Sequence, residues 1–148
     1  MKKLILMTLV SIALFGCGEK KVTEDMLIGD WGCTFARYNA KWENGLFQDF
    51  DASHGKATNK TLVRFYTKDN QLWVESEKKV NPFNLNYFSG ESSISKSAFG
   101  ITTKNNNSIE YISSDKFKIK TIYESRDEVD ETNNNKEKTE LICERIME

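Results

Sequence analysis

The chain has 148 residues, with 21 lysines and arginines against 22 aspartates and glutamates, and a single histidine, His54. This length fits one domain. The nearly neutral charge removes the electrostatic basis for nucleic-acid binding. A single histidine nearly excludes a histidine-based zinc site, and it makes Ser-His-Asp or Cys-His catalysis depend on that one residue. We therefore predict neither a cofactor nor a nucleic-acid partner.

The N-terminal residues predict export. Met1-Lys2-Lys3 is positively charged, residues 4–14 are apolar apart from two hydroxyl side chains, and small residues follow. This order is typical of a secretory signal. The apolar run is too short to cross a bilayer, which takes about 20 residues.

The segment Leu14-Phe15-Gly16-Cys17 resembles the lipobox of bacterial lipoprotein precursors. The resemblance implies that residues 1–16 are a signal peptide and that Cys17 is acylated, as with palmitate, and anchors the chain in a membrane. Because Gly18 rather than aspartate follows the cysteine, the outer membrane is the expected location. A plain cleaved signal peptide is the alternative.

With Cys17 as the acylated residue, two cysteines remain for folding, Cys33 and Cys143. Exported proteins fold in an oxidising compartment where disulfides persist, so the even count predicts a bond between them. A loop this long would be worth about 4–5 kcal/mol in the chain-entropy description. Two free buried thiols are the alternative. A redox role is not expected, because there is no Cys-x-x-Cys motif.

The predicted organisation is a signal peptide (1–16), a lipidated polar tether (17–26) and a β domain (27–148). In the β domain, residues 27–37 alternate between apolar and polar, which is typical of a strand. Asn44-Gly45 favours a hairpin turn before a strand over 46–51. A polar loop through His54 is expected next.

The clearest hairpin is predicted from strands 61–67 and 71–77 around a turn at 68–70, with Pro82 in the connection that follows. Asn105-Asn106-Asn107 is interpreted as a turn, because asparagine tolerates left-handed backbone. Residues 124–140, rich in acids, are expected to form a solvated loop. The remaining predicted strands cover 84–89, 92–96, 98–104, 108–113, 117–125 and 139–147.

Short strands separated by frequent turns predict an all-β fold. The simplest topology is an antiparallel up-and-down meander, closed or nearly closed into a small barrel. Closure pairs the first strand with the last, and these strands carry Cys33 and Cys143. Closure would thus bring their Cα atoms within the roughly 7 Å that a disulfide requires.

Two end segments resemble lipocalin-like small β-barrel proteins: Gly29-Asp30-Trp31-Gly32-Cys33 and Leu141-Ile142-Cys143-Glu144-Arg145. The resemblance implies that Trp31 fills the base of a barrel. It also implies that Arg145 packs over the indole in a cation–π contact. Ordinary core and rim positions are the alternative for these two residues.

The sequence offers few catalytic groups. His54 would need a placed nucleophile and an orienting acid. Glu75 and Glu77, expected on one strand face, could imitate a glycosidase pair but are more typical of a solvent-exposed face. We therefore expect a protein that is not an enzyme.

Aromatic residues suggest binding instead. Phe83, Tyr87 and Phe88 lie beside turn residues and are a candidate ligand or partner surface at a barrel mouth. Both a packed interior and a hollow one remain open.

The sequence thus predicts an envelope lipoprotein that acts as a non-catalytic binding module. Lipocalin-like binding of a small apolar ligand, or of another envelope protein, is the first hypothesis. The alternative is a purely protein–protein role, such as enzyme inhibition or phage or plasmid exclusion. Residues 124–140 and 38–60 would then be the contact surfaces.

Overall fold

The computed structural model describes residues 20–51 and 60–147, and almost all regular structure in them is antiparallel β. The predicted all-β class is therefore confirmed. The helical elements are one turn of α-helix, α1 (Glu24–Leu27), and the 3-10 turns η1 (Leu85–Phe88) and η2 (Glu131–Asn133). The strands are β1 (Gly29–Glu43), β2 (Leu46–Asp51), β3 (Thr61–Lys68), β4 (Gln71–Ser76), β5 (Lys79–Pro82), β6 (Ser89–Lys96), β7 (Ile101–Ser113), β8 (Lys116–Asp127) and β9 (Asn135–Arg145).

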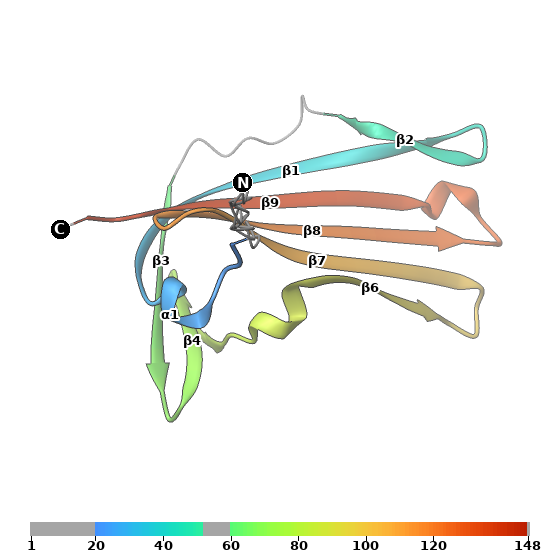
Figure 1. The fold of residues 1–148 in the computed structure, drawn as a ribbon. Helices are drawn as coiled ribbons and strands as arrows, with labels where there is room; N and C mark the ends of the chain where they lie inside the picture. Colours follow the sequence, from blue (N-terminus) through green and yellow to red (C-terminus); the bar gives the residue numbers. More distant parts are fainter. Residues whose placement is uncertain (1–19, 52–59, 148) are drawn as a thin grey trace, which may run out of the picture.

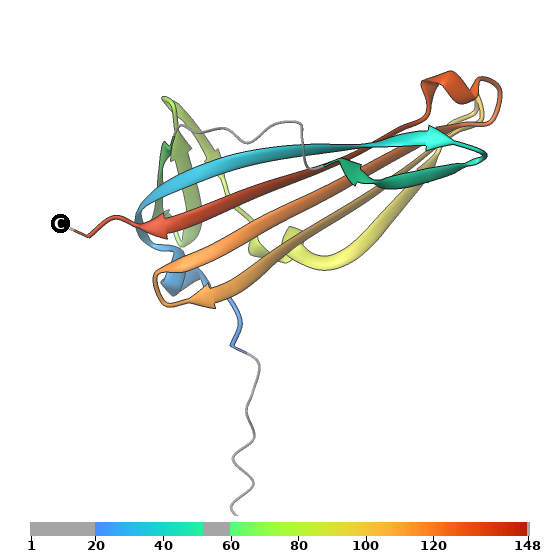
Figure 2. The same cartoon turned by 90° about the horizontal axis from the view of Figure 1, so that it is seen from above.

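The strands form one sheet in the order β5-β4-β3-β1-β9-β8-β7-β6, with β2 paired to β1. The sheet curls into a half-barrel (Figures 1 and 2). Most chain neighbours pair with one another, except β2 with β3 and β5 with β6, and β1 pairs with β9, so the first strand meets the last as predicted. Along this order the half-barrel is open between β5 and β6, and β2 forms a further edge beside the second half of β1.

The two ends of the sheet differ (Figure 1). At one end, which we call the base, α1 and the hairpin strands β3 and β4 lie against the long strands. The other end, which we call the arm, consists of residues 35–51, 89–108 and 119–141. The hydrophobic core lies in the base, where the largest fully buried side chains are Trp31, Phe117, Leu27, Cys33 and Cys143. In the arm only Ala40 is buried.

The predicted disulfide is present. Cys33 and Cys143 face each other directly across β1 and β9, and they are bonded with their Cα atoms 4.1 Å apart. Phe117 of β8 is in turn paired with Cys143. The bond thus joins the two central strands inside the core and closes a segment with a sequence separation of 110.

Several predicted boundaries are wrong. Asn105-Asn106-Asn107 lies inside the unbroken strand β7, paired to β8 throughout, and is not a turn. Asn84 caps a 3-10 turn by accepting a 3.0 Å hydrogen bond from Asn86, so residues 84–88 are not a strand and the next strand begins at Ser89. Pro82 ends the edge strand β5 and is not in a connection. There its missing N–H removes no hydrogen bond that the sheet needs.

The acidic loop is shorter than predicted, because β8 continues to Asp127 and β9 begins at Asn135. At the other end of the chain, Val22 of the expected tether is buried and Met26 packs against the core, so these two residues contact the β domain. Cys17 and His54 lie outside the described residues. Within the described residues, no helix is long and apolar enough to cross a membrane.

Candidate functional site

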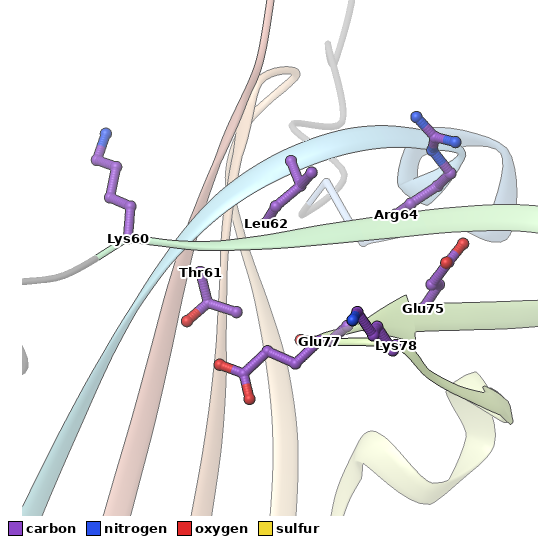
Figure 3. A pocket seen from close by; sticks show the side chains of 8 residues that line it. Lys60, Thr61, Leu62, Arg64, Glu75, Glu77 and Lys78 are labelled. Atoms are coloured by element: carbon purple, nitrogen blue, oxygen red, sulfur yellow. The ribbon is translucent and has the colours of Figure 1, made fainter.

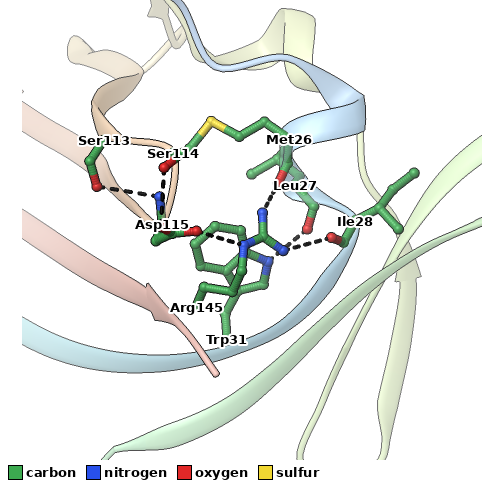
Figure 4. Close-up of polar contacts among 8 residues, drawn as sticks. All are labelled: Met26, Leu27, Ile28, Trp31, Ser113, Ser114, Asp115 and Arg145. Carbon is green, nitrogen blue, oxygen red and sulfur yellow. Dashed lines mark hydrogen bonds and ion pairs between the residues drawn. The ribbon is translucent and has the colours of Figure 1, made fainter. Parts of the chain in front are cut away.

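Arg145 organises the base (Figure 4). Its guanidinium lies 4.2 Å from the centre of the Trp31 indole, which is the contact that the lipocalin resemblance implied. The same group donates hydrogen bonds of 2.6 Å to the Met26 carbonyl, 3.0 Å to the Ile28 carbonyl and 3.2 Å to the Asp115 carboxylate. Arg145 therefore holds the α1 segment against the end of the sheet.

Trp31, on which the Arg145 guanidinium packs, makes two further contacts. Its Nε1 donates a 2.7 Å hydrogen bond to the Leu27 carbonyl, and its ring meets Phe117 edge-to-face with centroids 4.6 Å apart. Both side chains are fully buried. The polar groups of Arg145 and Trp31 are bonded to other parts of the chain, so we regard this cluster as structural.

A hollow of about 540 Å³ lies on the outer face of β3 and β4 (Figure 3). Glu75 and Glu77 both line it, but only Glu75 is on the strand, whereas Glu77 is in the β4–β5 turn with φ +48°. Arg64 pairs with Asp30 at 2.6 Å, which lowers the pKa of that carboxyl. Lys60, Arg64 and Lys78 line the hollow beside the two glutamates, so basic and acidic side chains share it.

The candidate aromatic surface at Phe83, Tyr87 and Phe88 is divided by the fold. Phe83 packs edge-to-face on Phe65 at 5.1 Å, and Phe88 stacks on Phe83 at 5.0 Å. Only Tyr87 is well exposed, at 73%. Two of the three rings thus extend the core of the base.

A second open hollow of about 650 Å³ lies between η1, β7 and the N-terminal segment. Phe88 and Tyr111 supply part of its wall, but Lys20, Lys21 and Glu110 share it. In the described part of the chain, core side chains fill the base of the curled sheet, whereas the arm has a hollow of about 230 Å³ bordered by Phe50, Ile122 and Lys136. A small apolar ligand would prefer an enclosed apolar pocket.

The far end of the arm has a different character. Three turns lie there together, at residues 43–46, 97–100 and 128–134, and we call them the end loops (Figures 1 and 2). The first is the predicted Asn44-Gly45 turn, in which both residues have positive φ. Trp42, beside it, donates a 3.1 Å hydrogen bond to Glu131 of the third loop.

The second loop is fixed by hydrogen bonds at both sides. The backbone N–H of Ser97 donates to the Ile101 carbonyl at 2.8 Å, and Gly100 donates back to the Ser97 carbonyl at 3.3 Å. The Ser97 hydroxyl accepts from Phe99 and Ile101. Gly100 has φ +82°, a left-handed conformation that other residues rarely adopt. The backbone on both sides of Phe99 is therefore held by hydrogen bonds.

The third loop is organised by Asp127. Its carboxylate accepts hydrogen bonds from the Asn133 amide at 3.0 Å and from the backbone of Val129 and Asp130 at 2.9 and 3.1 Å. These donors, the Asn133 amide first, lower the pKa of Asp127. The Asn134 side chain accepts from the Asp127 N–H at 2.7 Å. The 3-10 turn η2 is thus held without a core beneath it.

The second and third loops are also joined to each other. The Glu128 N–H donates to the Gly100 carbonyl at 3.3 Å, and Lys96 pairs with the Glu128 carboxylate at 2.7 Å. Phe99 and Val129 lie on these joined loops and are 84% and 85% exposed, while Leu46 of the first loop is 53% exposed. Apolar side chains this exposed on ordered turns are typical of contact sites.

Charge surrounds these apolar side chains. The end loops contain Glu43, Glu128, Asp130 and Glu131 and no lysine or arginine. Lys96 neutralises one of these acids, Glu128, so the surface combines exposed apolar side chains with a net excess of acid and suits a basic protein partner.

Sequence reasoning found only part of this site. Residues 124–140 and 38–60 were named as contact surfaces, and they contain Val129 and Leu46. Phe99 was missed, because it was assigned to a strand over 98–104. The Ser-x-Phe-Gly order at 97–100 could have indicated a turn, since serine and glycine are both common in turns.

No protein-family model matches the chain, and no curated protein sequence matches it. The function is therefore inferred from the geometry of the site alone.

Proposed function

We propose that this protein is a lipid-anchored, non-catalytic module of the bacterial outer membrane that binds another protein through its end loops. The observation that carries the proposal is the near-complete exposure of Phe99 and Val129 on two hydrogen-bonded turns. Ordering such turns before binding reduces the entropic cost of association. Anchoring through Cys17 is part of the proposal and follows from the lipobox resemblance alone.

The packed base favours a protein partner over a small apolar ligand, because the Trp31, Phe65 and Phe117 rings fill it. The hollow in the arm is lined partly by charged side chains, which suit an apolar ligand poorly. The partner that fits the end loops has an apolar recess for Phe99 and Val129, surrounded by lysine or arginine. Its association should slow as salt rises, because long-range charge attraction is screened.

Site-specific photo-crosslinking tests this proposal in cells that produce the full chain. A benzophenone amino acid replaces Phe99 in one variant and Tyr87 in another, because Tyr87 is also exposed but lies away from the end loops. We expect a discrete protein adduct at position 99 that is absent at position 87. Adding Val129→Ser should remove the adduct, and adding Ile112→Ser, an exposed position elsewhere, should keep it.

Two results would contradict the proposal. One is the absence of a protein adduct at position 99, and the other is an equal adduct at both positions. A small apolar molecule that co-purifies with the chain in native mass spectrometry would support the ligand hypothesis instead. The anchor is tested separately, since Cys17→Ser should abolish acylation and membrane fractionation.

A further inference from the structure

The hollow in the arm lies on a concave face of the sheet, apart from the end loops. Phe50 of β2 and Ser92 of β6 both line it, with Ile122 of β8 between them. In the arm these two strands stand at opposite edges of the sheet, since β2 pairs with β1 and β6 pairs with β7. Side chains from both edges can border one hollow only because the sheet curves around it.

Strand alternation extends this face beyond the hollow. Alternate residues of a strand point to the same side of a sheet, and directly paired residues share that side. Ile122 is paired with Asn106 on β7 and with Lys138 on β9, so the face can be followed from these positions. We call it the trough. Its basic side chains are Lys104, Lys118, Lys120, Arg126, Lys136 and Lys138.

The acids of the trough are fewer than its bases, and all of them are paired. The ion pairs are Glu110–Lys118 at 2.7 Å, Glu124–Lys136 at 3.1 Å and Glu140–Lys138 at 3.2 Å. Arg126 shares Glu124 with Lys136. Among the described residues, neither Lys104 nor Lys120 has a carboxylate within salt-bridge distance. The trough therefore has an excess of three positive charges.

We propose that the trough binds a phosphate monoester whose organic part is apolar. Such a group carries a charge of about −1.5 to −2 at neutral pH and has three strong acceptor oxygens, so several ammonium groups can bind it together. A single carboxylate would leave most of the excess charge uncompensated. Lys104, which lines the hollow without an acidic partner, binds the phosphate, and Phe50 and Ile122 contact the organic part.

The size and polarity of the hollow define the ligand further. Its volume of about 230 Å³ equals the share of roughly eight water molecules in the liquid, which suits one small organic group. The Asn106 amide already donates to the Gly90 carbonyl, so the lysines are the donors left for the phosphate. This site uses none of the end loops, and it neither requires nor excludes the proposed function.

Calorimetric titration of the full chain in a non-ionic detergent, with phenyl phosphate as the probe, tests the proposal. We expect saturable binding that Lys104→Met weakens about tenfold or more, because a charge-assisted hydrogen bond is lost. Lys104→Arg should keep it. Lys68→Met is the matched control, since Lys68 is an exposed lysine at the end of β3, and it should leave the affinity unchanged. Lys120→Met should also weaken binding, and it decides the case if Lys104→Met does not fold.

Other probes separate the charge from the apolar part. Inorganic phosphate lacks the ring and benzoate carries less charge, so both should bind more weakly than phenyl phosphate. Dihexanoyl phosphatidic acid identifies the source of the phosphate: tighter binding than phenyl phosphate would indicate a lipid headgroup, and weaker binding a soluble ester. The proposal is overturned if phenyl phosphate does not saturate, if Lys68→Met weakens its binding as much as Lys104→Met, or if benzoate or inorganic phosphate binds equally well.

Discussion

The base and the arm share the same strands but are stabilised in different ways. In the base, Trp31 and Phe117 are fully buried and the disulfide crosses between β1 and β9. In the arm the same strands continue with both faces accessible, so that Phe35 and Tyr123 are 38% and 37% exposed. One sheet therefore passes from a packed core into a single layer.

The arm depends on contacts between neighbouring side chains on its surface. Lys138 lies over the Tyr38 ring at 4.2 Å, and Lys136 lies over Phe47 and Phe50 at 5.6 and 5.7 Å. Each such contact contributes about 0.5–1 kcal/mol at exposed sites. The difference between the two regions teaches that a sheet can extend beyond its core when aromatic rings and charges alternate across its strands.

Two tryptophans on β1 provide the sharpest test of this comparison. We expect Trp31→Ala to lower the free energy of unfolding by about 3–5 kcal/mol, because it leaves a cavity in the core. Trp42→Ala in the arm removes a half-buried ring that packs on Phe47 at 4.8 Å and bonds to Glu131. Its cost should be about 1–2 kcal/mol. Urea denaturation of both variants measures the loss in the free energy of unfolding. Equal losses would contradict the proposed difference between base and arm.

The sequence predicted the base better than the arm, for a physical reason. Around Trp31 and Cys33 the large apolar side chains are buried in the core and alternate in sequence with Asp30, Gly32 and Thr34, so the strand pattern is visible. The disulfide and the β1–β9 pairing could be inferred there. In the arm neither face is buried, and residues such as Asn105 and Asn107 are tolerated inside a strand. Local preference for a turn was therefore a poor guide, because pairing with β8 decides the conformation.

The end loops were predicted as acidic but not as ordered. The run Asp127-Glu128-Val129-Asp130-Glu131 reads as a solvated loop, since like charges repel. Its order comes from the Asp127 carboxylate and from the Gly100 carbonyl of another loop. The second of these contacts joins segments that are distant in the chain, and no local pattern encodes it.

Replacing one arginine in the base and one in the arm tests the same comparison, with a smaller expected loss of stability. Arg145→Met should cost about 2–3 kcal/mol, because it leaves the Met26 and Ile28 carbonyls without their charged donor. Arg126→Met is the matched change in the arm, where the guanidinium lies 5.5 Å from the rings of Trp42 and Phe47. It should cost about 0–1 kcal/mol. Thermal unfolding of the two variants shows which substitution lowers the stability more. A larger loss of stability for Arg126→Met would contradict the prediction.

The smallest expected effect is on how the stability of the arm falls at acidic pH. Burial raises the pKa of Glu124, but Lys136 at 3.1 Å and Arg126 at 2.7 Å outweigh it, so the pKa is lowered overall. A carboxyl with a lowered folded pKa contributes stability above its unfolded pKa, and that contribution is lost as the pH falls through the folded pKa. Glu124→Gln should therefore flatten the decline of stability below about pH 4.5, near the unfolded value. Urea denaturation between pH 7 and pH 3 measures this slope, with Glu77→Gln in an exposed turn as the control. An unchanged slope for Glu124→Gln would mean that this ion-pair cluster does not stabilise the arm.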